Sequence, residues 1–354
     1  MVGFLLFWSA VFPAPAAFTS FHVFGDSLST TSSNLTAGPL YYGERWSNGR
    51  VWVEVLAQRQ GVTFNPDKNT NSFFGNTSSN LFAETSAYSP PADASNALVV
   101  IWVNNADLYY PALDPTPTLA KFTNTINLAL TNQYKAITNL YAKGIRTLVM
   151  PNIVDISTVP QFNTYSAQTN LFHQVSTNYN VSFYSTLNRA RTNCPGLTIF
   201  APDFFALLTN LIAFPTTYGV SNALGNGLSI DALHAQNFGL PIANTNGYGT
   251  NLIFWDKTDP TAMVHMWMAN LAQQLISPVQ ITNVTSANGS NELDLVNVPI
   301  GQSGLVLGCA DLAQPVWTTN ASFISSNATQ SVYIPAYWPQ WFYRLSFPFS
   351  WTWP

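Results

Sequence analysis

The sequence has little charge of either sign. Its 354 residues include 12 Lys and Arg and 16 Asp and Glu, which gives 8% charged residues and a formal net charge of -4. Because no basic run is present, nothing attracts a phosphate backbone or an acidic membrane, and we expect no nucleic-acid partner. With 14% aromatic residues and mostly Asn, Thr and Ser as polar residues, the surface fits neutral ester or carbohydrate-like substrates.

Cysteine and histidine are also scarce. The only cysteines are Cys194 and Cys309, and the four histidines do not combine with them or with acids at a metal-ligand spacing. Glycine-rich phosphate loops are absent as well. We therefore expect no metal and no cofactor. The two cysteines form either one disulfide or two buried free thiols, and the sequence leaves both open.

Uninterrupted apolar runs of membrane-spanning length are missing, so no transmembrane segment is expected. Residues 1–17 combine a short apolar run with small residues before position 18, which is typical of a signal peptide although no Lys or Arg precedes the run. This reading predicts a secreted or cell-surface protein. The alternative is a buried first strand of the mature fold.

Strand-like and helix-like segments alternate over most of the chain. Apolar residues at three- and four-residue steps predict helices at about 118–143 and 164–191, the first of them ended by Gly144. Runs rich in β-branched and aromatic residues predict strands at 22–24, 98–103, 147–150 and 197–200. This alternation indicates an α/β domain with a parallel sheet covered on both faces.

The pattern changes after residue 276. Short alternating runs such as 292–296 and 331–334, broken by Gly, Pro and Asn-Gly, predict a small C-terminal β module. The expected domains are therefore a signal peptide at 1–17, an α/β domain at 18–276 and a β-rich module at 277–354. The aromatic tail from Trp338 onward fills a core or, as the alternative, forms a ligand or assembly surface.

One motif, Gly25-Asp26-Ser27, directly follows the first predicted strand. Gly25 permits a tight exit from the strand, and Ser27 then lies at the carboxyl edge of the sheet, where open α/β folds bind ligands. A serine hydrolase needs such a raised hydroxyl, a base to take its proton and donors for the oxyanion. Gly-Asp-Ser alone is a common tripeptide.

Further blocks make the pattern specific. In order along the chain they are residues 24–29, 45–57, 72–76, 101–108, 151–157, 203–219 and 254–261. Together they resemble the GDSL/SGNH hydrolase superfamily, and in particular its lipase-like GDSL esterases, over about residues 18–276. The resemblance implies an SGNH-type three-layer α/β/α sandwich. It also implies Ser27 as nucleophile, the N–H groups of Ser27 and Gly75 in the oxyanion hole, and Asp256 as the acid that orients a histidine.

The expected histidine is missing. Family members carry it three residues after the acid, where this chain has Asp259. An aspartate with a reference pKa of ~3.9 is a weaker base than imidazole at ~6.5, although Asp256 beside it would raise one pKa of the pair. As an alternative, Asp259 before Pro260 caps a helix from Thr261 to Leu275.

Two other histidines are candidates for the base. His265 lies six residues beyond Asp259, ~8 Å along the predicted helix, so it is either structural or brought in by a shifted helix start. Asp231 and His234 in an Asn- and Gly-rich insertion form either a rebuilt dyad or a chance pair.

The oxyanion asparagine is also altered. Aligning residues 102–107 with the family's Gly-x-Asn-Asp puts Ala106 where the asparagine belongs, and Asn105 is one residue off. A loop at the strand end can compensate for such a shift. Losing one donor of this kind costs a factor of ~10² to 10³ in rate.

Two functional hypotheses follow. The first is an exported esterase or acylhydrolase that cleaves ester bonds of lipid or acylated carbohydrate with Ser27, Asp256 and an atypical base. The second is an inactive SGNH fold with an extracellular binding role or self-association, favoured by the altered positions and by low charge, which weakens repulsion between copies.

Overall fold

The computed structural model describes residues 18–32, 41–163, 165, 167–220, 252–336 and 341–348. The predicted signal peptide and the Asp231 and His234 pair lie outside the described residues, as do Trp338, Trp351 and Trp353 of the aromatic tail.

A parallel sheet forms the centre of the larger part of the molecule. Its strand order is β1-β2-β3-β4, and every neighbouring pair is parallel. The strands are β1 (Ser20–Gly25), β2 (Ala97–Trp102), β3 (Thr147–Val149) and β4 (Thr198–Phe200). All six residues of β2 are buried, as expected for a strand covered on both faces.

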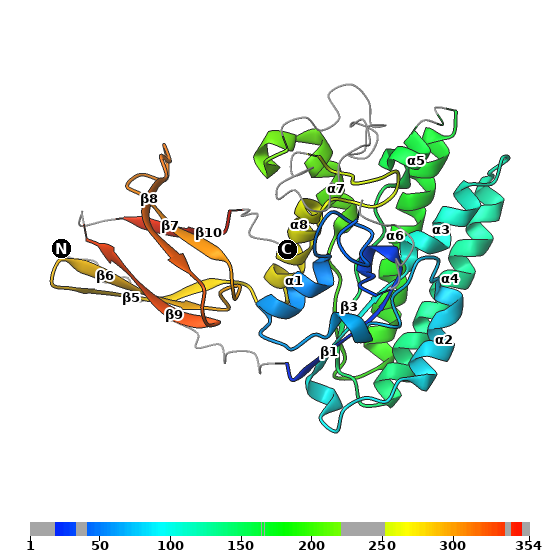
Figure 1. Ribbon diagram of the computed structural model, residues 1–354, viewed down its shortest axis with the longest axis horizontal. Helices are drawn as coiled ribbons and strands as arrows, with labels where there is room; N and C mark the ends of the chain where they lie inside the picture. Colours follow the sequence, from blue (N-terminus) through cyan, green and yellow to red (C-terminus); the bar gives the residue numbers. More distant parts are fainter. Residues whose placement is uncertain are drawn as a thin grey trace.

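Helices form a layer on each side of this sheet (Figure 1). One layer contains α2 (Ser78–Ala87), α3 (Asn104–Ala112), α4 (Leu119–Ala142) and α6 (Thr169–Asn193), with the short α5 (Pro160–Asn163) beside it. The other contains α1 (Trp52–Arg59), α7 (Phe204–Ala213) and α8 (Ala262–Ile276). The predicted three-layer α/β/α sandwich is confirmed.

The longest helices follow their sequence patterns with one shift. α4 begins after Thr118, whose hydroxyl accepts the Lys121 N–H at 3.4 Å, and it ends at Gly144 with a φ of 95°. α6 begins at Thr169, five residues later than predicted. The preceding chain is used by α5 and by a turn in which the Gln168 N–H bonds to the Tyr165 carbonyl at 2.8 Å.

Short 3₁₀ helices occur in the connections. They are η1 (Ser27–Ser29), η3 (Pro66–Lys68), η4 (Ala94–Asn96), η5 (Ile156–Thr158) and η6 (Pro215–Tyr218). Among the described helices, none is long and apolar enough to cross a bilayer.

Antiparallel strands follow α8. They form two three-stranded sheets with the orders β10-β7-β8 and β5-β6-β9, and Figure 1 shows them beside the α/β sandwich. The strands are β5 (Gln280–Ala287), β6 (Ser290–Val296), β7 (Ser303–Cys309), β8 (Thr318–Ile324), β9 (Thr329–Pro335) and β10 (Phe342–Ser346). Buried residues alternate along β6 and enclose a second hydrophobic core around Leu293, Leu295 and Val306.

The two cysteines are not joined. Cys194 follows α6, Cys309 ends β7, and both are buried free thiols. Of the two alternatives left by the sequence, the structure has the free thiols.

Candidate active site

Strand β1 places Ser27 at the carboxyl edge of the sheet. The strand ends at Gly25, where a Cβ would lie only 2.6 Å from the Cβ of Ser29, so only glycine lets the chain turn this tightly into η1. Asp26 stabilises the turn, because its Oδ1 accepts the Leu28 N–H at 3.1 Å. The side chain of Ser27 is consequently left in a pocket and not in the core.

Gly75 is held next to Ser27 by the end of β1. The Gly25 carbonyl accepts the Phe73 N–H at 3.3 Å and the Asn76 side-chain amide at 3.0 Å. Gly75 lines the same pocket and has a φ of 81°, a conformation that favours glycine. Within the described chain, the N–H groups of Ser27 and Gly75 donate to no other group, so both are available to an oxyanion.

Helix α3 brings the altered oxyanion segment to the pocket. Ala106 lines the pocket at the position of the family asparagine, so a methyl group replaces a donor. Asn104 is buried in the core, where its amide donates to the Pro151 carbonyl at 2.9 Å and its Oδ1 accepts from Gln133 at 2.9 Å. Asn104 therefore cannot take over the role.

Asn105 does line the pocket, but its amide is oriented by the protein. Its Oδ1 accepts the Val154 N–H at 3.2 Å. The buried Nδ2 has no hydrogen-bond partner of normal geometry among the described residues, yet it lies near enough to Asp26 to favour the charged form of that carboxyl and lower its pKa. Asn105 as the oxyanion donor stays a prediction.

The closing motif forms a tight turn before α8. The Trp255 N–H bonds to the Asp259 carbonyl at 2.8 Å and the Thr261 N–H bonds to the Ile253 carbonyl at 2.9 Å. Since α8 begins only at Ala262 with Thr261 as its N-cap, the prediction that Asp259 caps this helix is wrong. These two backbone hydrogen bonds keep the chain extended as far as Thr261, so the N-cap lies two residues after Asp259.

Asp256 and Asp259 lie together in this turn. Oδ1 of Asp256 accepts the backbone N–H groups of Thr258 at 2.8 Å and Asp259 at 2.7 Å, and its Oδ2 accepts the Tyr41 hydroxyl at 2.5 Å. The Thr258 hydroxyl lies between the two carboxyls, 3.2 Å from Oδ1 of Asp256 and 2.8 Å from Oδ2 of Asp259. Asp256 thus orients the turn that presents Asp259.

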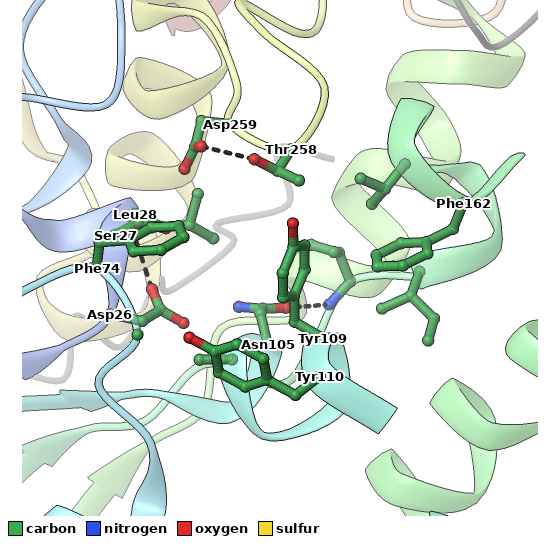
Figure 2. A pocket seen from close by; sticks show the side chains of 15 residues that line it. Asp26, Ser27, Leu28, Phe74, Asn105, Tyr109, Tyr110, Phe162, Thr258 and Asp259 are labelled. Atoms are coloured by element: carbon green, nitrogen blue, oxygen red, sulfur yellow. Dashed lines mark hydrogen bonds between the residues drawn. The ribbon is translucent and has the colours of Figure 1, made fainter. Parts of the chain in front are cut away.

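Asp259 lines the pocket on the side of Ser27 (Figure 2). Its side chain is buried, and Oδ1 makes no hydrogen bond of normal geometry with the described residues. Burial, followed by the negative charge of Asp256, raises the pKa of Asp259 well above its ordinary value, while the hydroxyls of Thr258 and Ser27 oppose this rise. A carboxyl group of unusually high basicity therefore faces Ser27.

No histidine of the described chain lines the pocket. His265 is fully buried in α8, both ring nitrogens lack partners among the described residues, and desolvation lowers its pKa to about 3. His22 packs on Tyr88, and His173 pairs with Asp155 at 2.5 Å. The structure brings together Ser27, Gly75, Asn105, Asp256 and Asp259, and it leaves His265 outside.

Aromatic and aliphatic side chains form the rest of the pocket (Figure 2). They are Leu28, Phe74, Tyr109, Tyr110, Val154, Ile156, Val159 and Phe162. The sequence analysis missed Tyr109 and Tyr110, although their spacing of four residues from Asn105 and Ala106 would place them on the same face of a helix. No Lys or Arg lines the pocket, and the described residues contain no cluster of three metal-binding side chains.

Comparisons with known proteins identify the family of this chain. The family described as GDSL-like Lipase/Acylhydrolase matches residues 22–272. A solved structure of a gut microbial diltiazem-metabolizing enzyme is 10% identical with a TM-score of 0.43, over 82% of this chain and 59% of that one. The chain thus spans about three fifths of the length of that enzyme. No curated protein matches.

The fold and the site define an α/β/α sandwich of the SGNH type with its serine at the carboxyl edge of the sheet. The chain belongs to the GDSL-like lipase/acylhydrolase family. Membership supports a hydrolase or esterase activity in general.

Proposed function

We propose that this protein is an exported ester hydrolase in which Ser27 is the nucleophile and Asp259 the general base. The observation that carries the proposal is the position of the buried Asp259 carboxyl beside Ser27 in one pocket. Export is supported by the signal-like sequence of residues 1–17.

The reaction follows from this arrangement. Asp259 takes the proton of the Ser27 hydroxyl while Oγ attacks the acyl carbon, and the N–H groups of Ser27 and Gly75 stabilise the oxyanion. Collapse of the tetrahedral intermediate breaks the ester bond, and the proton on Asp259 passes to the leaving alcohol. Water then gives a proton to Asp259 and attacks the acyl carbon, the bond between that carbon and Ser27 Oγ breaks, and the proton returns from Asp259 to Oγ.

The pocket lining supports a neutral, apolar acyl group. Its far wall consists of Val154, Ile156, Val159 and Phe162, and its ionisable carboxyls are Asp26 and Asp259. Among the described residues of the lining there is no Lys or Arg, so none of them offers a charged partner to a negatively charged substrate. An ester of a lipid or an acylated carbohydrate fits these conditions.

A generic acyl ester assay combined with a fluorophosphonate label tests this function. The label reacts with an activated serine, so we expect it on Ser27 of the native protein and expect ester hydrolysis that Ser27→Ala abolishes. Equal hydrolysis rates of wild type and Ser27→Ala, or no labelling of Ser27, would contradict the proposed ester hydrolase activity.

A second candidate is an inactive SGNH fold with an extracellular binding or assembly role. It is favoured by one observation, the replacement of the imidazole by a carboxyl whose raised pKa keeps it protonated over a wider pH range. This candidate predicts no labelling of Ser27 at any pH and ordered assemblies of the purified protein in electron microscopy.

A further inference from the structure

We propose that the hydroxyl of Tyr110 is an oxyanion-hole donor that replaces the side-chain amide missing at Ala106. This inference rests on the proposed function, because an oxyanion forms only if Ser27 attacks an ester. It assigns a catalytic contact to a residue outside the motifs of the sequence.

A donor is missing where the oxyanion would form. Ala106 has only a methyl group, and Asn104 is fully engaged in the core. Asn105 has its carbonyl bound by Val154, and its Nδ2 is directed to Asp26. The positions that carry the side-chain donor in the family therefore supply no free donor here. Only the backbone N–H groups of Ser27 and Gly75 are left for the oxyanion.

Tyr110 reaches the same place from one turn further along α3. It lies four residues after Ala106, so both side chains occupy one face of the helix. Its hydroxyl is 2.9 Å from the point where a Cβ on Gly75 would lie. Figure 2 shows this hydroxyl directed toward the Asp26 and Ser27 side of the pocket.

The hydroxyl of Tyr110 is also available to donate. Within the described chain it makes no hydrogen bond, and the ring has an edge contact with Tyr109 at 5.6 Å between centroids. Tyr110 is 49% exposed, so its hydroxyl can turn without disturbing the core. A phenolic O–H is a hydrogen-bond donor and can donate a hydrogen bond to an oxyanion.

Tyr109 serves a different part of the pocket. Figure 2 shows the Tyr109 hydroxyl directed toward Thr258, and burial, followed by the charges of Asp259 and Asp256, raises the pKa of Tyr109. The hydroxyls of the two neighbouring tyrosines thus point to different parts of the pocket.

The test compares Tyr110→Phe, Ala106→Asn and the double variant in kcat and KM for an acyl ester. We expect Tyr110→Phe to lower kcat ~10²-fold with KM nearly unchanged, as for the loss of an oxyanion donor. Ala106→Asn in the Tyr110→Phe background restores the family amide and should recover ~10-fold or more of kcat. Tyr333→Phe, in the C-terminal β module, is the matched control and should leave kcat unchanged.

The outcomes separate the two proposals. If wild type hydrolyses the ester through Ser27 but Tyr110→Phe keeps its kcat, or only Asn105→Ala lowers kcat, the Tyr110 assignment is overturned and the proposed function stands. A rise in KM at constant kcat would also overturn it, since that indicates a role in ground-state binding. A wild type that neither labels at Ser27 nor hydrolyses esters refutes the proposed function first.

Discussion

At the scale of residues, the proposed chemistry of this site depends on Asp259. A carboxylate normally has too low a pKa to deprotonate a serine efficiently at neutral pH. Here burial and the neighbouring Asp256 raise the pKa of Asp259 well above its ordinary value, so the carboxylate is a stronger base than an exposed aspartate. In the proposed mechanism, replacing histidine by aspartate changes the pH range of the base and does not remove it.

Substitutions at Asp259 should change the rate in opposite directions. Asp259→Asn keeps the size of the side chain but cannot take a proton, so we expect kcat/KM to fall ~10²-fold or more. Asp259→His supplies a base with a reference pKa of ~6.5 beside Ser27, and we expect a higher rate at neutral pH. The measurement is kcat/KM of the three proteins from pH 5 to 9.

The pH profile of the wild type provides the control for these variants. Because only the ionised form of Asp259 accepts a proton, kcat/KM should rise with pH through its raised pKa. An Asp259→Asn variant as active as wild type would show that Asp259 is not the base.

At the scale of elements, α8 starts without a cap from its own sequence. Its N-cap Thr261 makes no side-chain capping bond, and the Ala262 N–H instead bonds to Oδ1 of the buried Asn48 at 2.8 Å. Asn48 precedes α1, so α1 and α8, which lie on the same face of the sheet, are joined at their starts. This contact also holds the turn that carries Asp259.

Removing that contact should destabilise the fold. We expect Asn48→Ala to lower the free energy of unfolding by ~1–2 kcal/mol, as for the loss of a buried helix cap, measured by urea denaturation. Asn65→Ala is the matched control, because Asn65 caps the exposed η3 through the Asp67 N–H at 3.0 Å. Equal losses from both variants would contradict the role of Asn48.

At the scale of the whole molecule, buried carboxyls couple stability to pH. Burial is the main reason that the pKa of Asp26 and the pKa of Asp107 each rise from 3.8 to about 7. Between these values the folded protein retains protons that the unfolded chain has lost. The contribution of these two carboxyls to the free energy of unfolding is therefore greatest below about pH 4, and it falls as the pH rises toward 7.

Asp107→Asn tests this coupling. Asparagine keeps the Oδ1 that accepts the Ser78 N–H and hydroxyl at 2.9 Å but does not titrate. We expect a flatter curve of unfolding free energy between pH 4.5 and 7.5, with a difference of at most ~4 kcal/mol. Asp114→Asn, at an exposed aspartate whose pKa Lys121 lowers, should leave the slope unchanged in this range. Parallel curves for Asp107→Asn and wild type would refute the coupling.

Much of this architecture could be predicted from local pattern. The strands around Val23, Val100, Leu148 and Ile199 and the helix ended by Gly144 lie where the residue types put them, because burial periodicity and a left-handed glycine act over a few neighbouring residues. The start of α6 and the cap of α8 were predicted incorrectly. The start of α8 depends on pairing of the Thr261 N–H with the Ile253 carbonyl, and the start of α6 depends on a turn between Gln168 and Tyr165; helical periodicity indicates neither bond.

The sequence by itself determined the family, the order of strands and helices, and the absence of a histidine at position 259. The tertiary structure alone decided that Asp259 faces Ser27, that His265 is buried, that Cys194 and Cys309 are unpaired, and that Tyr110 lies over Gly75. The reason is physical. Burial and the approach of residues distant in sequence set basicity and hydrogen-bonding capacity, and neither is present in the residue types alone.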